Sequence, residues 1–319
     1  MTARPLLAAR YRGRFAPSPT GPLHFGSLIA AVASCADARA AGGEWLLRIE
    51  DVDEPRTRAG AESVILAQLD RYGFAWDGPV LRQRERTDDY AAALARLREG
   101  GHVYECACTR RELETAPIGA GGERVYPGTC RKGIPADRRD RAPRAWRVRV
   151  PATATVGFTD RLQGPVAQDL ARDVGDFVLR RADGLYAYQL AVVVDDALSG
   201  VNAVVRGADL LASTPRQILL QRLLGFATPS YLHVPVALGR SGEKLSKQTR
   251  AAPLPDDPLP ALVAAWRFLD QPWPASGATP DTVASFWTYA RETWAPARLP
   301  PVPMLPAPGS FAAGARDRV

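Results

Sequence analysis

A turn built from proline, glycine, serine and threonine at residues 18–22 separates a strand-like segment from a helical one, and this arrangement limits the fold more than any other feature. Residues 12–17 have strand character, and residues 28–41 are alanine-rich with apolar side chains at helical spacing. Residues 44–49 again have strand character. A strand, helix, strand unit of this kind predicts two parallel strands joined by a right-handed crossover, and therefore an α/β fold.

The chain repeats this alternation after a long interruption. Helices are predicted over residues 59–72 and 86–99. From residue 106 to about residue 173 the helical period disappears, and glycine, proline and arginine become frequent. A second α/β half then has a predicted helix at 214–224 and strand signals at residues 176–180, 186–195, 203–207 and 232–238. The interrupted sheet predicts a Rossmann-like domain that is split by an insertion.

The C-terminal part of the chain has a different character. A proline-rich linker after residue 250 leads to a helical piece at residues 259–292, where Trp266, Phe286 and Trp287 are core candidates. From residue 295 the composition predicts a mobile tail. These boundaries divide the chain into two halves of a catalytic domain at 1–105 and 176–250, an insertion at 106–175, a helical appendix at 251–294 and a tail at 295–319.

Charge and cysteine content narrow the function classes. The formal net charge of +7 favours a polyanionic partner, although charge alone indicates nucleic acid only weakly. Four cysteines in 319 residues do not form a disulfide scaffold, and three of them lie in one short segment, which indicates metal binding. Cys35 lies in the alanine-rich helical run and is predicted to be a core residue. No apolar run suits a signal peptide or a membrane span, so a cytoplasmic protein is expected.

The turn into the first helix carries the first candidate site, which ends in His24-Phe-Gly26-Ser27. A helix N-terminus offers unpaired N–H groups and a positive dipole to phosphates, and Gly26 allows a ligand to approach the backbone closely. His24 is placed to donate a hydrogen bond to a phosphate as negative charge develops during displacement. On its own a His-x-Gly turn is a weak signal, because a structural histidine gives the same pattern.

A polar loop near the end of the second α/β half is the second candidate site. Residues 239–248 follow an apolar strand and carry Lys244 and Lys247, three positions apart. Such a loop can close over a triphosphate, because its ammonium groups neutralise the phosphoryl group in transfer. Both motifs lie at the carboxyl end of a strand, and this pairing favours a nucleotide site over a solvated charged loop.

At these residues the chain resembles the class I aminoacyl-tRNA synthetases. His24-Phe-Gly-Ser27 resembles the HIGH motif of that class, and Lys244-Leu-Ser-Lys247-Gln resembles its KMSKS motif. Residues 15–21 and 47–56 resemble the glutamyl branch, and the similarity covers roughly residues 12 to 250. The resemblance implies that ATP binds, with Mg²⁺, at His24, Gly26, Ser27 and Lys247. It also implies that His24, Gly26, Lys244 and Lys247 are the catalytic residues.

The charges of a glutamate ligand predict a matching pocket. Its two carboxylates and one ammonium need about two cations and one anion, because an unpaired buried charge is costly. Arg14 and Arg206 supply the cations, and which of them meets which carboxylate stays open. Glu50 is suited to hold the α-ammonium, while Tyr188 and Ser18 add hydrogen bonds. The resemblance implies the same site, composed of Arg14, Phe15, Ala16, Pro17, Ser18, Glu50, Tyr188 and Arg206.

Three cysteines of the insertion predict a zinc site. Cys106, Cys108 and Cys130 can form three corners of a tetrahedral Zn²⁺ site, which then needs a fourth ligand. His102 is close in sequence and is the usual choice. The resemblance instead implies Tyr126, because short glutamyl-type enzymes that act on queuosine carry a Cys-x-Cys, Tyr, Cys set. One zinc ion per chain is expected.

The resemblance and the length of the chain together imply a reaction. Only about 70 residues follow Lys247, which is too few for the anticodon-binding region of a glutamyl-tRNA synthetase. The expected enzyme adenylates glutamate and transfers it to the queuosine in the anticodon loop of tRNA(Asp), acts as a monomer and has no membrane partner. Two alternatives stay open: a truncated glutamyl-tRNA synthetase that charges a tRNA 3′ end, and a non-catalytic RNA-binding protein descended from a synthetase.

Overall fold

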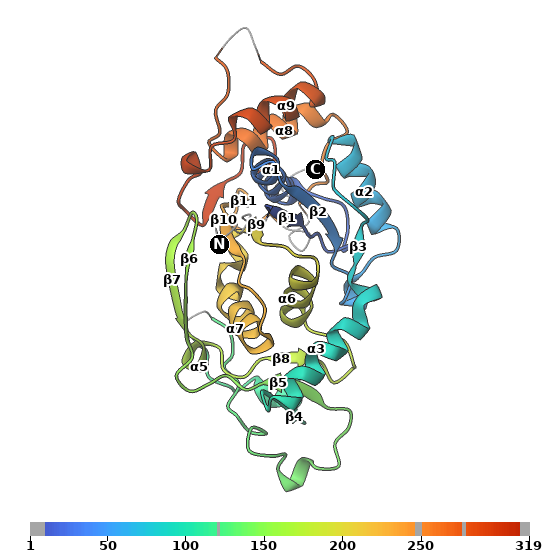
Figure 1. Cartoon of the computed structure of the whole chain (residues 1–319), viewed down its shortest axis with the longest axis vertical. Coiled ribbons are helices and arrows are strands. Elements are labelled where there is room, and N and C mark those ends of the chain that lie inside the picture. Colours follow the sequence, from blue (N-terminus) through green and yellow to red (C-terminus); the bar gives the residue numbers. More distant parts are fainter. Residues whose placement is uncertain (1–9, 120–121, 246–250, 276–278, 313–319) are drawn as a thin grey trace, which may run out of the picture.

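The computed structural model describes residues 10–119, 122–245, 251–275 and 279–312. Figure 1 shows a central region of parallel strands and helices, an antiparallel sheet towards one end of the long axis, and two helices covering the other end. Two large clusters of buried apolar side chains form the core. One is built mainly from the first α/β half and the C-terminal helices, and the other from the second α/β half and the antiparallel sheet.

The first α/β half has the predicted strand, helix, strand arrangement. Its elements are β1 (Arg12–Phe15), α1 (Phe25–Ala40), β2 (Glu44–Ile49), α2 (Ala61–Arg71) and β3 (Leu81–Arg82). β1 pairs with β2 in parallel, and β2 pairs with β3 in parallel, so the prediction of parallel strands is confirmed. α1 packs closely because it is rich in alanine, and Trp45 Nε1 donates a hydrogen bond to Ser34 Oγ (3.0 Å) between β2 and α1.

The second α/β half lies directly beside the first. Its elements are α6 (Tyr188–Leu198), β9 (Ala203–Gly207), α7 (Thr214–Leu224), β10 (Ser230–Val234) and β11 (Val236–Leu238). β9 and β10 are parallel, and the N–H of Asn202 donates to the carbonyl of Arg12 at the start of β1 (3.1 Å). Pro235 separates β10 from β11 within the single strand predicted at residues 232–238, because proline has no N–H for a sheet ladder.

The strand predicted at residues 186–195 is wrong, because this segment forms the helix α6. The run from Leu190 to Val194 is buried on every side, as is typical both of a central parallel strand and of a buried helix. A short apolar run therefore does not distinguish the two by periodicity. Its β-branched valines favoured a strand locally, but packing against α3 (Thr87–Glu99) and α7 selects the helix.

An antiparallel sheet and a hairpin lie in and beside the predicted insertion. Their strands and short helices are β4 (Val103–Cys106), α4 (Arg110–Leu113), β5 (Ala145–Val148), β6 (Thr155–Asp160), β7 (Gly164–Asp169), α5 (Leu170–Asp173) and β8 (Val178–Arg180). β5 pairs antiparallel with both β4 and β8, whereas β6 pairs with β7. The sheet thus joins the predicted insertion to segments just before and just after it.

Two helices cap the first α/β half, α8 (Pro258–Phe268) and α9 (Val283–Thr293). Trp266 and Phe286 are completely buried and meet edge to face with ring centroids 5.8 Å apart, as expected of core residues. Trp287 is half-buried and contacts Phe74, with ring centroids 4.8 Å apart. Short 3₁₀ helices occur at Glu54–Arg56, Gln83–Arg86, Ala136–Arg138, Ala208–Ser213 and Pro296–Arg298.

The prediction of a mobile tail from residue 295 is wrong as far as residue 312, where the described part of the chain ends. β12 (Met304–Pro306) pairs in parallel with β11, so this segment completes a sheet edge. Leu299 is 2% exposed, and Phe311 stacks on Phe25 with ring centroids 4.2 Å apart. Proline-rich composition predicts disorder only where no neighbouring surface is available, and here α1 and β11 provide one.

Candidate active site

A cavity of about 400 Å³ opens at the carboxyl ends of β1, β2, β9 and β10. This edge of a parallel sheet is the usual ligand-binding edge of α/β proteins. The cavity wall includes almost every residue singled out by sequence, namely Arg14, Phe15, Ala16, Pro17, Ser18, His24, Gly26, Ser27, Glu50, Tyr188, Arg206 and Lys244. Lys247, the other residue predicted for the glutamate and ATP sites, lies outside the described residues.

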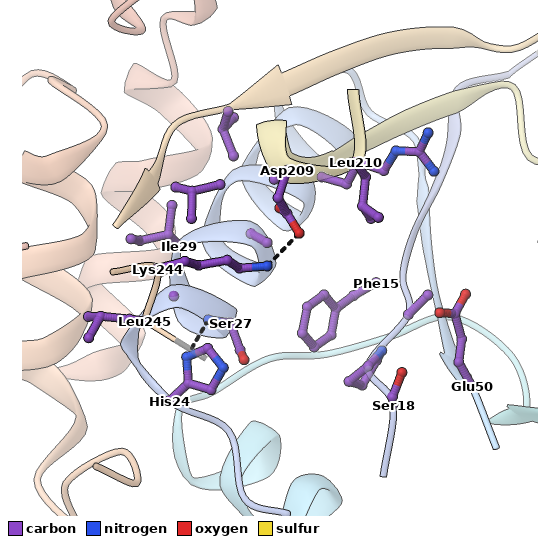
Figure 2. A pocket seen from close by; sticks show the side chains of 18 of the residues that line it. Phe15, Ser18, His24, Ser27, Ile29, Glu50, Asp209, Leu210, Lys244 and Leu245 are labelled. Atoms are coloured by element: carbon purple, nitrogen blue, oxygen red, sulfur yellow. Dashed lines mark hydrogen bonds and ion pairs between the residues drawn. The ribbon is translucent and has the colours of Figure 1, made fainter. Parts of the chain in front are cut away.

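The wall of the cavity has two chemically different sides. In Figure 2, His24 and Lys244 lie on one side of Phe15, whereas Ser18 and Glu50 lie on the other. The first side combines a helix N-terminus with an ammonium group, and the second holds the carboxylate of Glu50, whose side chain is 10% exposed. The arrangement suits a ligand with a phosphate-bearing part and an amino-acid part.

His24 is the N-cap residue of α1, and its Nδ1 accepts a hydrogen bond from the N–H of Ser27 (3.3 Å). Because Nδ1 accepts, the neutral ring carries its proton on Nε2, which is the donor a phosphate needs. A Cβ at Gly26 would lie 3.1 Å from the His24 ring and 3.1 Å from the carbonyl oxygen of Leu245. A side chain there would press on both neighbours, so glycine favours this close contact between protein segments as well as the close approach of a ligand.

Lys244 forms an ion pair with Asp209 across the cavity, as Figure 2 shows. The N–H of Leu245 donates to the carbonyl of Ala237 in β11 (2.9 Å), so the start of the predicted lysine loop is anchored to the sheet. Asp209 and Arg56 also line the cavity but were not predicted as site residues. Arg56 ends the recognised segment 47–56, and Asp209 lies three positions after Arg206, so proximity to these motifs is their sequence signal.

Arg14 and Glu50 are connected through a buried ion network. Asp196 accepts from Arg14 Nε (3.1 Å) and from Arg48 Nη1 (2.7 Å), and Arg48 Nη2 donates to Glu50 (3.2 Å). Burial opposes ionisation of Asp196, but the charges of Arg14 and Arg48 hold its pKa below the usual range. Burial raises the pKa of Glu50, although the charges of Arg48 and Arg14 oppose this shift. A ligand ammonium beside Glu50 would add a third positive charge and would favour the charged carboxylate.

Arg206 is buried near the end of β9, and its guanidinium donates three hydrogen bonds to other residues of the protein. Its Nε donates to His233 Nε2 (3.0 Å), and its Nη2 donates to Thr214 Oγ1 (2.9 Å) and Gln217 Oε1 (2.8 Å). Its Nη1 has no hydrogen-bond partner among the described residues. Because buried donors are normally paired, an anionic ligand in the cavity would complete this site.

The pKa of His233 lies below 6.5, because burial and the charge of Arg206 disfavour the imidazolium more than Asp160 favours it. The folded protein thus holds His233 neutral, whereas the unfolded chain binds a proton near pH 6.5. The stability linked to this histidine is present above pH 6.5 and is lost as the pH falls towards the lower folded pKa.

We expect the urea midpoint of the wild-type protein to fall more steeply than that of His233→Gln between about pH 7.5 and about pH 5.5, because the variant has no imidazole to protonate at this position. Urea unfolding followed by circular dichroism at several pH values measures both slopes. Parallel slopes would contradict a neutral His233 in the folded state.

The three predicted zinc ligands of the insertion lie together. The sulfur atoms of Cys106, Cys108 and Cys130 all lie within 4.8 Å of one another, and those of Cys108 and Cys130 are 3.7 Å apart. Two sulfurs bound to one zinc ion at about 2.3 Å in a tetrahedron are about 3.8 Å apart, so the spacing fits. Among the described residues, His102 does not belong to this cluster. Cys35 is separate and buried in the main core.

Tyr126 completes a four-atom arrangement with these thiols. Its hydroxyl lies 3.3 Å from the sulfur of Cys106 and 3.6 Å from that of Cys108. The guanidinium of Arg147 lies 4.0 Å from the centroid of the Tyr126 ring, and Arg138 Nη1 donates to the sulfur of Cys108 (3.2 Å). Nearby positive charges stabilise thiolates, which are the forms that bind metal. The residues present therefore fit a zinc ion.

Comparison with known proteins agrees with this geometry. Residues 10–255 match the catalytic domain of the class I tRNA synthetases (E and Q). The glutamyl-Q tRNA(Asp) synthetase of Dechloromonas aromatica (strain RCB) is 61% identical over 287 residues, which cover 89% of this chain and 94% of that protein. The protein of the same name from Thiobacillus denitrificans (strain ATCC 25259 / T1) is 56% identical over 93% of this chain and 98% of its own length.

The chain belongs to the glutamyl-Q tRNA(Asp) synthetase family. The predicted family and its class I catalytic core are thereby confirmed. A solved glutamate tRNA ligase from Elizabethkingia meningosepticum CCUG26117 has the same fold, with a TM-score of 0.75 and 24% identity, over 95% of this chain and 68% of the ligase. Within the described residues of this glutamyl-Q tRNA(Asp) synthetase family member, no helix has the length and apolar character needed to span a membrane.

Proposed function

We propose that this protein activates L-glutamate with ATP and transfers the glutamyl group to the queuosine in the anticodon of tRNA(Asp). The α-carboxylate of glutamate attacks the α-phosphorus of ATP, which forms glutamyl-adenylate and releases pyrophosphate. A hydroxyl of the acceptor then attacks the activated carbonyl carbon and releases AMP. The observation that carries the proposal is the 61% identity with a glutamyl-Q tRNA(Asp) synthetase over nearly the whole of both chains.

The amino-acid part of the cavity supports glutamate as the substrate. Arg14 and Arg206 offer two positive charges to its carboxylates, and Glu50 offers a negative charge to its ammonium. Tyr188 and Ser18 line the same cavity and supply hydroxyl groups, while Phe15, Ala16 and Pro17 form another part of its wall. The charge of the site then matches the charge of the ligand, and no buried charge is left unpaired.

The other part of the cavity supports ATP as the second substrate. His24 Nε2, the N-terminus of α1 at Gly26 and Ser27, and Lys244 face the region where the phosphates would lie. Lys247, in the segment that lies outside the described residues, would add a second ammonium group. Magnesium bound to the phosphates supplies further positive charge. Catalysis by these residues consists of positioning and charge stabilisation, since no covalent enzyme intermediate is required.

Cys106, Cys108, Tyr126 and Cys130 would hold one structural zinc ion. The four side chains belong to a small separate cluster of buried residues that packs beside β4. A metal at this point ties the chain after β4 to the loop before β5, which has little apolar core of its own. The zinc site would thereby stabilise the antiparallel sheet.

We expect the purified protein to contain about one zinc ion per chain, and the Cys106→Ser and Cys130→Ser variants to lose most of it, because each removes one thiolate of the site. Metal content per chain, measured by mass spectrometry, tests this. Cys35→Ser is the control, because Cys35 is buried in a different core cluster. Full zinc content in either of the two ligand variants would contradict the assigned ligands.

One labelling experiment tests the proposed function as a whole. The protein is incubated with ATP, radiolabelled glutamate and bulk tRNA, and the labelled tRNA and nucleotide are then identified. Label on the anticodon fragment of tRNA(Asp) is expected. Label at a 3′ end would instead support a truncated glutamyl-tRNA synthetase, and the absence of glutamate-dependent pyrophosphate exchange would support a non-catalytic RNA-binding protein.

A further inference from the structure

Two buried residues that do not line the cavity, His233 and Asp160, connect to Arg206 through hydrogen bonds. His233 in β10 is completely buried, and Asp160 at the end of β6 is 2% exposed. His233 Nδ1 lies 2.6 Å from Asp160 Oδ2, and His233 Nε2 accepts from Arg206 Nε at 3.0 Å. A continuous chain of hydrogen bonds thus runs from the β6–β7 hairpin to the cavity.

Asp160 is held in one orientation by backbone groups. Its Oδ1 accepts from the N–H groups of Leu162 (3.0 Å), Gln163 (2.9 Å) and His233 (3.2 Å). Burial opposes ionisation of Asp160, but these hydrogen bonds and His233 hold its pKa below the usual range. The carboxylate is therefore fixed and charged, and it leaves only Oδ2 to face the imidazole.

This fixed carboxylate determines the tautomer of His233. Nδ1 must carry the proton in order to donate to Asp160 Oδ2, so Nε2 of the neutral ring presents a lone pair. That lone pair faces the Nε–H of Arg206. The opposite tautomer would place two N–H groups against each other inside the protein, which is costly where water is excluded.

The guanidinium of Arg206 is consequently restrained on two edges. His233 accepts from Nε, while Thr214 and Gln217 accept from Nη2, so the plane of the group cannot rotate without breaking buried hydrogen bonds. Only Nη1 has no partner among the described residues, and Arg206 lines the cavity. The protein itself satisfies the other nitrogens, and the buried Nη1 is left without a partner beside the cavity.

We propose that Asp160 and His233 are positioning residues for substrate binding, which hold the guanidinium of Arg206 in the orientation that receives a carboxylate of glutamate. This inference rests on the proposed function of the cavity. The β6–β7 hairpin thereby takes part in the recognition of the amino acid. Its tip packs on β10, where the N–H of Arg161 donates to the carbonyl of Tyr231 (2.8 Å), and this contact places Asp160 beside His233. An arginine fixed before the ligand arrives binds more tightly than one that must be ordered on binding.

Substitutions at His233 test the role of the acceptor nitrogen. His233→Phe keeps a planar ring but has no acceptor, so we expect its KM for glutamate to rise about tenfold or more, with the KM for ATP unchanged. His233→Gln places a side-chain oxygen near the former Nε2 and should restore most of the affinity. Asp160→Asn keeps the shape of the residue but permits either tautomer of His233, and should raise the KM for glutamate by a smaller factor. Glutamate-dependent pyrophosphate exchange measures all three variants.

Tyr231→Phe is the matched control. Tyr231 lies on the same strand as His233, and the substitution removes its buried hydroxyl, which accepts from Gln221 of α7 (2.9 Å), but keeps the ring beside Arg206. A purely structural role for His233 would lower the amount of active enzyme, which reduces the maximal rate without changing the KM. An unchanged KM for glutamate in His233→Phe and Asp160→Asn, or an equal rise in Tyr231→Phe, would overturn the proposal.

Calorimetric titration of glutamate without ATP separates this inference from the proposed function. Wild-type binding with weaker binding by Asp160→Asn supports the inference, and does so even if His233→Phe fails to fold. Equal glutamate affinity in wild type and Asp160→Asn overturns the positioning role and leaves the proposed function standing. No glutamate binding by the wild-type protein overturns both.

Discussion

tRNA(Asp) from cells that cannot make queuosine is expected to accept no glutamate from this protein, whereas the same tRNA from cells that make queuosine is labelled. The two tRNAs share their sequence and 3′ end, and they differ in the base that would present the attacking hydroxyl. The difference is expected to approach all or none, because removing the nucleophile abolishes the transfer step instead of weakening it. Filter-bound radiolabelled glutamate measures the yield for each tRNA.

The activation step supplies the control for this experiment. The cavity contains candidate groups for glutamate and ATP without any contribution from RNA. Glutamate-dependent pyrophosphate exchange should therefore proceed without tRNA and at the same rate beside either tRNA. Nuclease digestion then separates the anticodon fragment from the 3′ fragment. Equal labelling of both tRNAs, or label on the 3′ fragment, would show that the acceptor is wrong.

Replacement of Arg206 by alanine is expected to lower kcat/KM for glutamate in pyrophosphate exchange by about a hundredfold or more. The variant removes a charged donor from a buried site, a loss of about 3 kcal/mol when a ligand carboxylate stays unpaired, and each 1.4 kcal/mol is a factor of ten. Arg206→Lys should recover only part of the loss, because a compact ammonium with three donors cannot serve His233, Thr214, Gln217 and a carboxylate at once.

Arg172→Ala is the control for general effects of losing an arginine. The Arg172 side chain is 73% exposed and pairs with its neighbour Asp173, away from the cavity wall, so its removal should leave exchange unchanged. Circular dichroism verifies that Arg206→Ala is folded, because the substitution leaves buried partners without their donor. Near wild-type exchange by Arg206→Ala would remove Arg206 from the glutamate site.

Most of the features that could be predicted from the sequence belong to local motifs. Short segments contain His24, Gly26, Lys244 and the pocket charges, and the chemistry of each segment is local, as in a helix N-terminus that attracts phosphate. The first parallel unit was also predictable, because its turn, its alanine-rich helix and its flanking strands lie within forty residues. These features depend on neighbours in the chain, so the sequence contains all the information that they require.

Contacts between distant segments were decided only by the tertiary structure. The run from Leu190 to Val194 becomes a helix because it is buried by α3 and α7, which its own apolar pattern does not specify. The segment around Met304 becomes a strand because β11 offers an open edge. Asp160 and His233 are 73 positions apart, and no local pattern marks them as a pair. Burial then makes their hydrogen bond strong and its loss costly, and burial is a property of the packed molecule alone.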